Sequence, residues 1–196
     1  MGEGVEAYVR RYVAETVEAI RPDYLPEAVG RIVPILLRAR TEGRTIFFFG
    51  NGGSASTASH FVVDIGKATL RGDGRRFRCL ALVDNVESVT AWANDAEYAV
   101  VFSEQLKGLA RAGDVAVGIS GSGNSPNVLR AMEEARAMGL STIGLTGMGG
   151  GRLKALVDVP VVVPSNSMQH VEDAHLLLGH LLTAYLRDEA PAADPG

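Results

Sequence analysis

The sequence predicts an α/β protein with a five-stranded parallel sheet between helices, in a flavodoxin-like three-layer arrangement. From residue 45 onward, short apolar runs alternate with helical stretches, which is typical of β-α-β units. The runs are apolar almost throughout, as expected for strands buried on both faces. The chain has 196 residues, 46% of them hydrophobic, which suits one domain with a substantial core.

A helical arm at residues 1–43 precedes the alternation. Helices are predicted over 4–21 and 25–42, with prolines at the junction and Gly43 at the end of the second. Pro34 is expected to kink this second helix or to delay its start. Three- and four-residue spacing places one set of apolar residues on one side of the first helix: Val5, Val9, Tyr12, Val13, Val17 and Ile20.

The remaining elements follow in order along a single domain, residues 1–188. The predicted strands are 45–49, 77–83, 115–119, 141–146 and 159–164. The predicted helices are 54–69, 86–94, 97–112, 126–138 and 170–187. The tail 189–196, EAPAADPG, has a composition typical of disorder.

Charge and composition exclude several classes of function. The net charge is −4, which argues against nucleic acid as the main partner. The arginine-rich run 71–78 is interpreted as a solvated loop, with an anion-binding patch as the less favoured alternative. No apolar run approaches the roughly 20 residues of a membrane span, and the N-terminus lacks a secretory signal, so a cytoplasmic protein is expected. The single cysteine, Cys79, is expected to be a small core residue.

Two glycine- and serine-rich loops lie where strands end and helices begin. In GNGGS, residues 50–54, Gly52 and its neighbours leave backbone N–H groups open to a ligand, and Ser54 is expected to cap the following helix. A tight turn with an ordinary cap is the alternative. The loop ISGSGNSPN, residues 119–127, brings Ser120, Ser122 and Ser125 to another helix start.

Together these loops favour a phosphate monoester as the ligand, because helix N-termini and hydroxyls supply many donors. No lysine follows the second loop, so it is not a nucleotide P-loop, and no nucleotide cofactor is expected. A third loop, TGMGGGRLK at 146–154, is interpreted as a flexible turn into a short helix.

Four titratable residues could lie near these loops. His60 and Asp64 are four apart and share a helix face, whereas Glu172 and His180 lie on the last predicted helix. Each histidine alone would more often be structural. The set could form an acid–base pair, a metal site with two histidines and two carboxylates, or both.

In order and spacing, these motifs resemble the sugar isomerase (SIS) domain, and within it the phosphoheptose isomerase group. The resemblance rests on GNGGSASTASHF, ALVDNVESVTAWAND, SGSGNSPNVLRAMEEA, IGLTGMGGG and the histidine helix, and it extends to about residue 187. It implies interconversion of sedoheptulose 7-phosphate and glycero-manno-heptose 7-phosphate. It also implies a homotetramer with active sites between subunits.

The resemblance also implies roles for individual residues. The phosphate ligands would be Ser54, Ser120, Ser122 and Ser125, with Asn51 and Asp95 near the sugar. His180 matches the catalytic histidine, and His60 matches a zinc ligand of some members. The chain departs from the family at Asp64, where the family has a catalytic glutamate, and at Glu172, where it has a glutamine. The additional carboxylate at Glu172 favours a divalent ion, with Zn²⁺ held by His60, Asp64, Glu172 and His180.

The expected reaction is an aldose–ketose isomerisation through a cis-enediol, with Asp64 and His180 moving the protons. Two alternatives remain open: a non-catalytic SIS module that binds a replication initiator or senses a sugar phosphate, and an isomerase of another phosphosugar.

Overall fold

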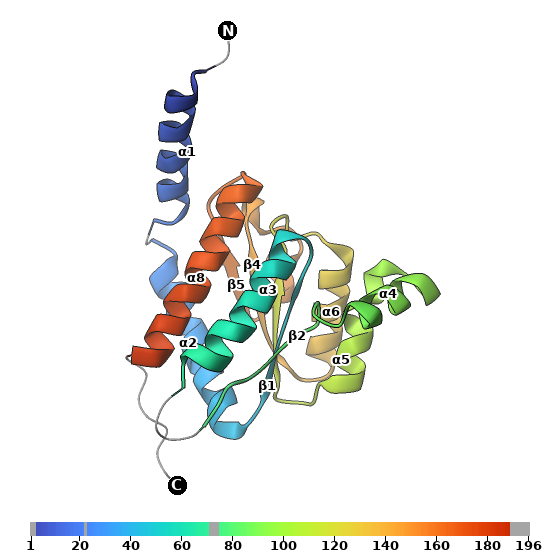
Figure 1. The fold of residues 1–196 in the computed structure, drawn as a ribbon. Helices are drawn as coiled ribbons and strands as arrows, with labels where there is room; N and C mark the ends of the chain where they lie inside the picture. The colour runs from blue at the N-terminus through green and yellow to red at the C-terminus, as the bar shows by residue number, and fades with distance from the viewer. Residues whose placement is uncertain (1–2, 22, 71–74, 189–196) are drawn as a thin grey trace.

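The computed structural model describes residues 3–21, 23–70 and 75–188. Within these ranges, one parallel sheet has the strand order β2-β1-β3-β4-β5 (Figure 1). The predicted fold class is therefore confirmed. The strands are β1 (Thr45–Gly50), β2 (Arg78–Ala81), β3 (Val115–Ile119), β4 (Ser141–Thr146) and β5 (Val159–Val162). The predicted disordered tail and residues 71–74 of the arginine-rich run lie outside the described residues.

Helices cover both faces of the sheet (Figure 1). One face packs against α2 (Leu25–Glu42), α3 (Gly53–Val63) and α8 (Met168–Asp188). The other packs against α5 (Ser103–Leu109), α6 (Pro126–Ala137) and α7 (Leu153–Leu156). Because side chains alternate along a strand, Phe48 enters the first core, and Phe47 and Phe49 enter the second.

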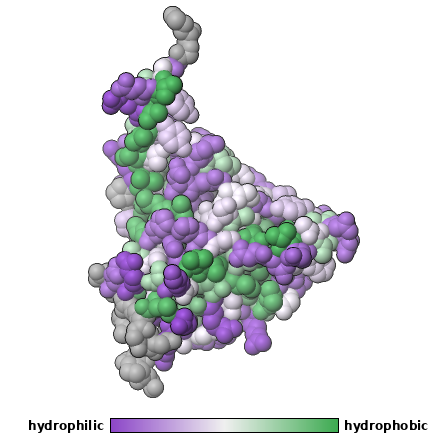
Figure 2. Space-filling view, viewed as in Figure 1, coloured by the Kyte–Doolittle hydropathy of each residue, from purple (hydrophilic) through white to green (hydrophobic). Residues whose placement is uncertain are grey.

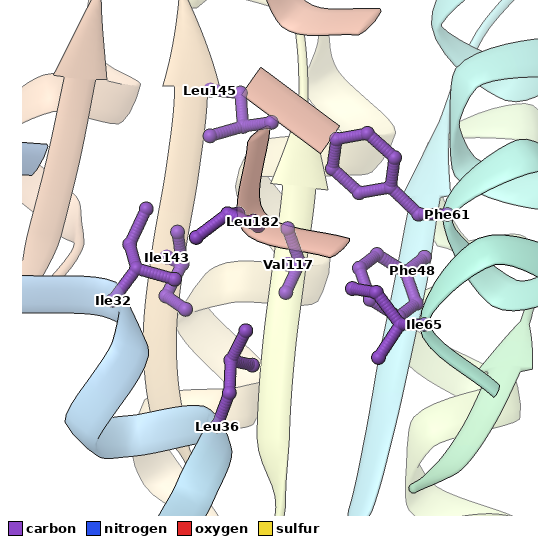
Figure 3. Close-up of a pocket in the computed structure, with 9 residues that line it drawn as sticks. All are labelled: Ile32, Leu36, Phe48, Phe61, Ile65, Val117, Ile143, Leu145 and Leu182. Atoms are coloured by element: carbon purple, nitrogen blue, oxygen red, sulfur yellow. The ribbon is translucent and has the colours of Figure 1, made fainter. Parts of the chain in front are cut away.

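The first core joins α3 and α8 firmly to the sheet. Phe61 of α3 packs edge-on against Phe48, with the ring centroids 5.6 Å apart. The side chains around them leave a cavity of only about 10 Å³, which has an entirely apolar lining and is expected to be dry. Figure 3 shows the lining residues: Ile32, Leu36, Phe48, Phe61, Ile65, Val117, Ile143, Leu145 and Leu182.

Two predicted helices are interrupted. The helix expected over 54–69 changes at Asp64 from α3 to a π-helical turn, η1 (Asp64–Ala68). The helix expected over 97–112 is instead a 3₁₀ turn, η2 (Tyr98–Val100), followed by the short α5. Between β2 and η2 lies α4 (Val86–Asp95), none of whose residues is buried.

The N-terminal helix α1 (Val5–Ala19) extends away from the sheet (Figure 1). Four valines of its apolar side are exposed and form a stripe (Figure 2); the exposed fractions are 81% for Val5, 51% for Val9, 55% for Val13 and 50% for Val17. The next helix, α2, begins at Leu25 and continues through Pro34, so the proline does not delay its start. No helix in the described part of the chain combines the length and apolar composition that a membrane span needs.

Candidate functional site

A pocket of about 260 Å³ lies where β1 and β3 end and α3 and α6 begin. It brings together the residues of the two loops singled out from the sequence. No lysine or arginine lines it among the described residues, so any anion there would be held by neutral donors. The lining consists of Asn51, Gly52, Gly53, Ser54, Ile119, Ser120, Gly121, Ser122, Ser125, Met168 and Glu172.

The first wall of the pocket is the N-terminus of α3. Gly52 is the N-cap residue, with φ of 55° and ψ of −123°, and no side chain caps the helix. The prediction that Ser54 caps this helix was therefore wrong, since Ser54 is buried within the first turn. The N–H groups of Ser54 and Ala55 already donate to the carbonyls of Asn51 and Gly52, so the start of α3 offers a ligand mainly the positive end of the helix dipole.

The second wall is the serine loop. The Oγ atoms of Ser120 and Ser125 lie 3.0 Å apart, so the two hydroxyls form one donor and acceptor pair. Ser125 is the N-cap residue of α6, with its side chain free of the cap hydrogen bond, and Pro126 follows at the first helical position as expected. The hydroxyls of Ser120 and Ser125 and the N-terminus of α6 therefore lie at the same pocket.

The third loop braces the serine loop, which its interpretation as a flexible turn did not anticipate. The N–H of Gly147 donates to the carbonyl of Gly121 at 2.9 Å, and that of Leu153 donates to the carbonyl of Gly123 at 3.0 Å. The short helix expected there is present as α7, preceded by the 3₁₀ turn η3 (Met148–Gly150).

Within a single chain, Glu172 lines the pocket formed by the two glycine- and serine-rich loops. Its carboxylate lies over Gly53, where an added Cβ would be 2.4 Å from Oε2. The helix N-terminus there favours a negative charge. Because Glu172 and His180 are eight residues apart on α8, they are separated by about 12 Å along the helix axis. Asp95, predicted near the sugar, is an exposed residue at the end of α4 and does not line the pocket.

The other titratable residues meet at the outer side of α3 and α8. His60 Nε2 lies 3.1 Å from His180 Nε2 and 3.2 Å from Asp64 Oδ2. His180 Nε2 lies 3.7 Å from the same carboxylate oxygen. Asp64 is held there at the point where the α-helical pattern changes to a π turn, a feature frequent at functional sites.

These three residues fit a divalent ion. One ligand atom from each lies within 4.8 Å of the others. Ligand atoms about 2.0–2.1 Å from a tetrahedral Zn²⁺ are separated by about 3.3 Å, close to the distances between these atoms. Both imidazoles are exposed, so the face opposite the protein is open for a further ligand.

His175 has structural surroundings. His175 is buried between α8 and the sheet, where one ring nitrogen lies 3.3 Å from the carbonyl of Thr146. Burial lowers the pKa of His175 to about 4, so its ring is neutral at pH 7.

Burial likewise raises the pKa of the Cys79 thiol to about 12, which leaves it a partly buried, unreactive residue as predicted.

Sequence reasoning missed two residues that contact Asn51. Asn127, buried in the first turn of α6, exchanges two hydrogen bonds with the Asn51 amide, and Tyr98 donates its hydroxyl hydrogen to Asn51 Oδ1 at 2.9 Å. Tyr98 lies 47 positions from Asn51 in a turn that local pattern did not predict, so nothing in the sequence linked them.

A model of the SIS domain matches residues 8–147. The chain belongs to this family of sugar isomerase domains.

Particular relatives carry a more specific name. A phosphoheptose isomerase of Paramagnetospirillum magneticum is 38% identical over 177 residues, covering 89% of this chain and 92% of that protein. One from Desulfovibrio desulfuricans is 43% identical over 168 residues, covering 86% and 78%. The structure of a phosphoheptose isomerase from Neisseria gonorrhoeae has a TM-score of 0.86 at 32% identity, covering 93% of this chain and 98% of that one.

Proposed function

We propose that this protein is a phosphoheptose isomerase, which interconverts sedoheptulose 7-phosphate and D-glycero-D-manno-heptose 7-phosphate. The observation that carries the proposal is the pairing of a serine-lined anion pocket with the group formed by His60, Asp64 and His180 at the far side of the same helix, α3. The similarity to named phosphoheptose isomerases over most of the chain selects a seven-carbon phosphosugar.

The phosphate would be bound by Ser54, Ser120, Ser122 and Ser125, together with the N-termini of α3 and α6. Hydroxyls and backbone N–H groups provide many hydrogen bonds without a fixed positive charge. Binding at this end of the substrate orients the reacting carbons, which are remote from the phosphate. Glu172 and Asn51, on the same pocket wall, would hydrogen-bond to sugar hydroxyls.

Asp64 and His180 would carry the proton transfers. One removes a proton from C1 of the ketose while O2 is protonated, which gives the cis-enediol. The hydroxyl proton on O1 is then removed and C2 is protonated, which gives the aldose. His180 Nε2 and Asp64 Oδ2 are 3.7 Å apart, so the two groups are near enough to act on adjacent atoms of one substrate.

As an alternative to proton transfer by His180, the same three facing atoms of His60, Asp64 and His180 would hold a Zn²⁺ ion, because an Nε2 bound to a metal has no lone pair left for a proton. Such an ion would supply Lewis-acid polarisation of the substrate carbonyl. Although Asp64 has a shorter side chain than the family's glutamate, its oxygen lies within 3.2 Å of His60. Within one chain, Glu172 lines the phosphate pocket.

A homotetramer with sites between subunits would bury surfaces that one chain leaves open. The apolar stripe of α1 (Val5, Val9, Val13 and Val17) is exposed over its whole length, and α4 has no buried residue. Around the histidines, Val63 is 59% exposed and Leu181 is 38% exposed. Apolar surface beside a polar site is typical of an interaction surface.

Replacing His180 by Gln tests the catalytic assignment. The variant should fold, because the His180 side chain is exposed, yet it should lose at least about 100-fold in kcat. Circular dichroism would establish the fold, and a coupled assay on sedoheptulose 7-phosphate would give the rate. A variant with the wild-type rate would refute the role of His180.

A further inference from the structure

The amide of Asn51 is held in one orientation by a short chain of hydrogen bonds. The backbone N–H of Val128 donates to Asn127 Oδ1 at 3.0 Å, which fixes the Asn127 amide. Asn51 Nδ2 then donates to the same oxygen at 2.9 Å, and Asn127 Nδ2 donates back to Asn51 Oδ1 at 2.8 Å. If the Asn51 amide were rotated by half a turn, its Nδ2 would face the Nδ2 of Asn127 and its Oδ1 would face the Oδ1 of Asn127.

The hydroxyl of Tyr98 completes this arrangement. It donates to Asn51 Oδ1 at 2.9 Å, so the oxygen receives two hydrogen bonds, one for each lone pair. One polar group of the Asn51 side chain then has no partner among the described residues: the second hydrogen on Nδ2. Asn51 lines the serine pocket and is only partly buried, so this hydrogen is accessible to a ligand.

We propose that Asn51 acts only as a hydrogen-bond donor, that it reads an acceptor oxygen on the sugar chain of the substrate, and that Tyr98 restricts it to this role by occupying the lone pair of Oδ1 that Asn127 leaves open. An asparagine that could rotate would accept from or donate to a hydroxyl equally well. With Tyr98 and Asn127 in place, it offers a single N–H. Tyr98 therefore acts through Asn51, without being part of the phosphate-binding loop.

The position of Tyr98 agrees with a functional role more than with a contribution to stability. Its side chain is 53% exposed, and its turn is attached to α6 by the ion pair of Glu97 with Arg130. An exposed hydroxyl with one hydrogen bond contributes little to stability. The same bond matters more for binding, because without it one lone pair of Asn51 Oδ1 is free to accept from water or from a sugar hydroxyl, and Asn51 is no longer restricted to donation.

Tyr98→Phe tests the inference, with Tyr8→Phe as the matched control, since Tyr8 is similarly exposed on α1 and its hydroxyl has no hydrogen bond among the described residues. Calorimetry would measure the Kd of sedoheptulose 7-phosphate and, separately, that of inorganic phosphate. We expect Tyr98→Phe to weaken binding of the sugar phosphate by about 3- to 10-fold, the equivalent of one hydrogen bond. Binding of inorganic phosphate, the melting temperature and the Tyr8→Phe control should be unchanged.

Three outcomes would overturn the inference: unchanged sugar phosphate affinity in Tyr98→Phe, equal weakening of inorganic phosphate, or a wild-type protein that binds the sugar phosphate no tighter than inorganic phosphate. The inference rests on the proposed function for its ligand class, but binding and turnover separate the two. A wild-type protein that binds sedoheptulose 7-phosphate without isomerising it, and loses affinity in Tyr98→Phe, would refute the isomerase and support the role of Tyr98.

Discussion

The backbone of Gly179 lies directly against the ring of Phe61: a Cβ added at residue 179 would be 1.9 Å from Cε1 of that ring. This contact leaves no room for a side chain between α3 and α8, and it explains how two histidines 120 positions apart come together. His60 and His180 are the neighbours of the two contacting residues, and their Nε2 atoms are 3.1 Å apart. A side chain at residue 179 would separate the helices and with them the histidines.

Gly179→Ala should therefore be destabilising and should also impair the site. The methyl group has to displace a ring that is packed in the core, which we expect to cost about 1–3 kcal/mol of unfolding free energy. Gly30→Ala is the matched control, because it lies within α2 and an added Cβ meets nothing within 4 Å. That control should be neutral or stabilising by up to about 1 kcal/mol.

Urea denaturation would measure both variants. Equal stability of Gly179→Ala and wild type would contradict the packing argument.

Zinc should stabilise the folded protein through His60, Asp64 and His180. Ligand binding to the native state raises stability by about 2.7 kcal/mol when the free ion is at 100 times its Kd. The melting temperature should rise with added Zn²⁺ in the wild type and in the control Glu27→Gln, an exposed carboxylate on α2. In His60→Ala the rise should be absent. The same rise in His60→Ala would show that zinc binds elsewhere.

Acid should destabilise the protein through His175. Its pKa is about 4 in the folded state against an ordinary value of 6.5 for a solvent-exposed histidine, so between these pH values the unfolded chain binds more protons. The stability contribution is thus complete above pH 6.5 and is lost as the pH falls towards 4. At pH 5 the loss amounts to about 2 kcal/mol.

His175→Gln removes this titration. Its unfolding free energy should fall less between pH 7.5 and pH 5 than that of the wild type, by about 2 kcal/mol. An identical pH dependence in both proteins would contradict the buried, neutral state of His175.

The apolar stripe of α1 should be an interface between copies of this chain. Val13→Glu places a charge in the middle of the stripe and should yield smaller assemblies in light scattering. Ala7→Glu adds the same charge on the other side of α1 and should leave the assembly intact. If Val13→Glu has the mass of the wild-type assembly, α1 is not the interface.

The sequence allowed the fold and the serine pocket to be predicted because both depend on local patterns. Continuous apolar runs such as 45–49 mark strands buried on both faces, and the loops of glycine and serine mark the ends of β1 and β3. Since all strands of a parallel sheet end at one edge, both loops were expected at that edge, and the adjacency of β1 and β3 brings Ser54 and Ser120 into one pocket.

Features that depend on tertiary contacts could not be predicted in this way. The π turn at Asp64, the exposure of the α1 stripe and the bond from Tyr98 to Asn51 have no local signature. The predicted metal site of His60, Asp64, Glu172 and His180 comes together for three residues only; within one chain Glu172 lines the serine pocket, about 12 Å along the helix axis from His180. Apolar periodicity in α1 was read correctly as a helix, but it could not reveal that Val5, Val9, Val13 and Val17 are at least half exposed in a single chain.

The most direct test of the isomerase is the reaction itself in heavy water. The purified protein would be incubated with sedoheptulose 7-phosphate, with and without a chelator, and the sugar followed by NMR. The account predicts D-glycero-D-manno-heptose 7-phosphate with deuterium at C2, because the enediol is reprotonated from a group that exchanges with solvent. A folded, zinc-supplied protein that gives neither the aldose nor deuterium exchange would contradict it.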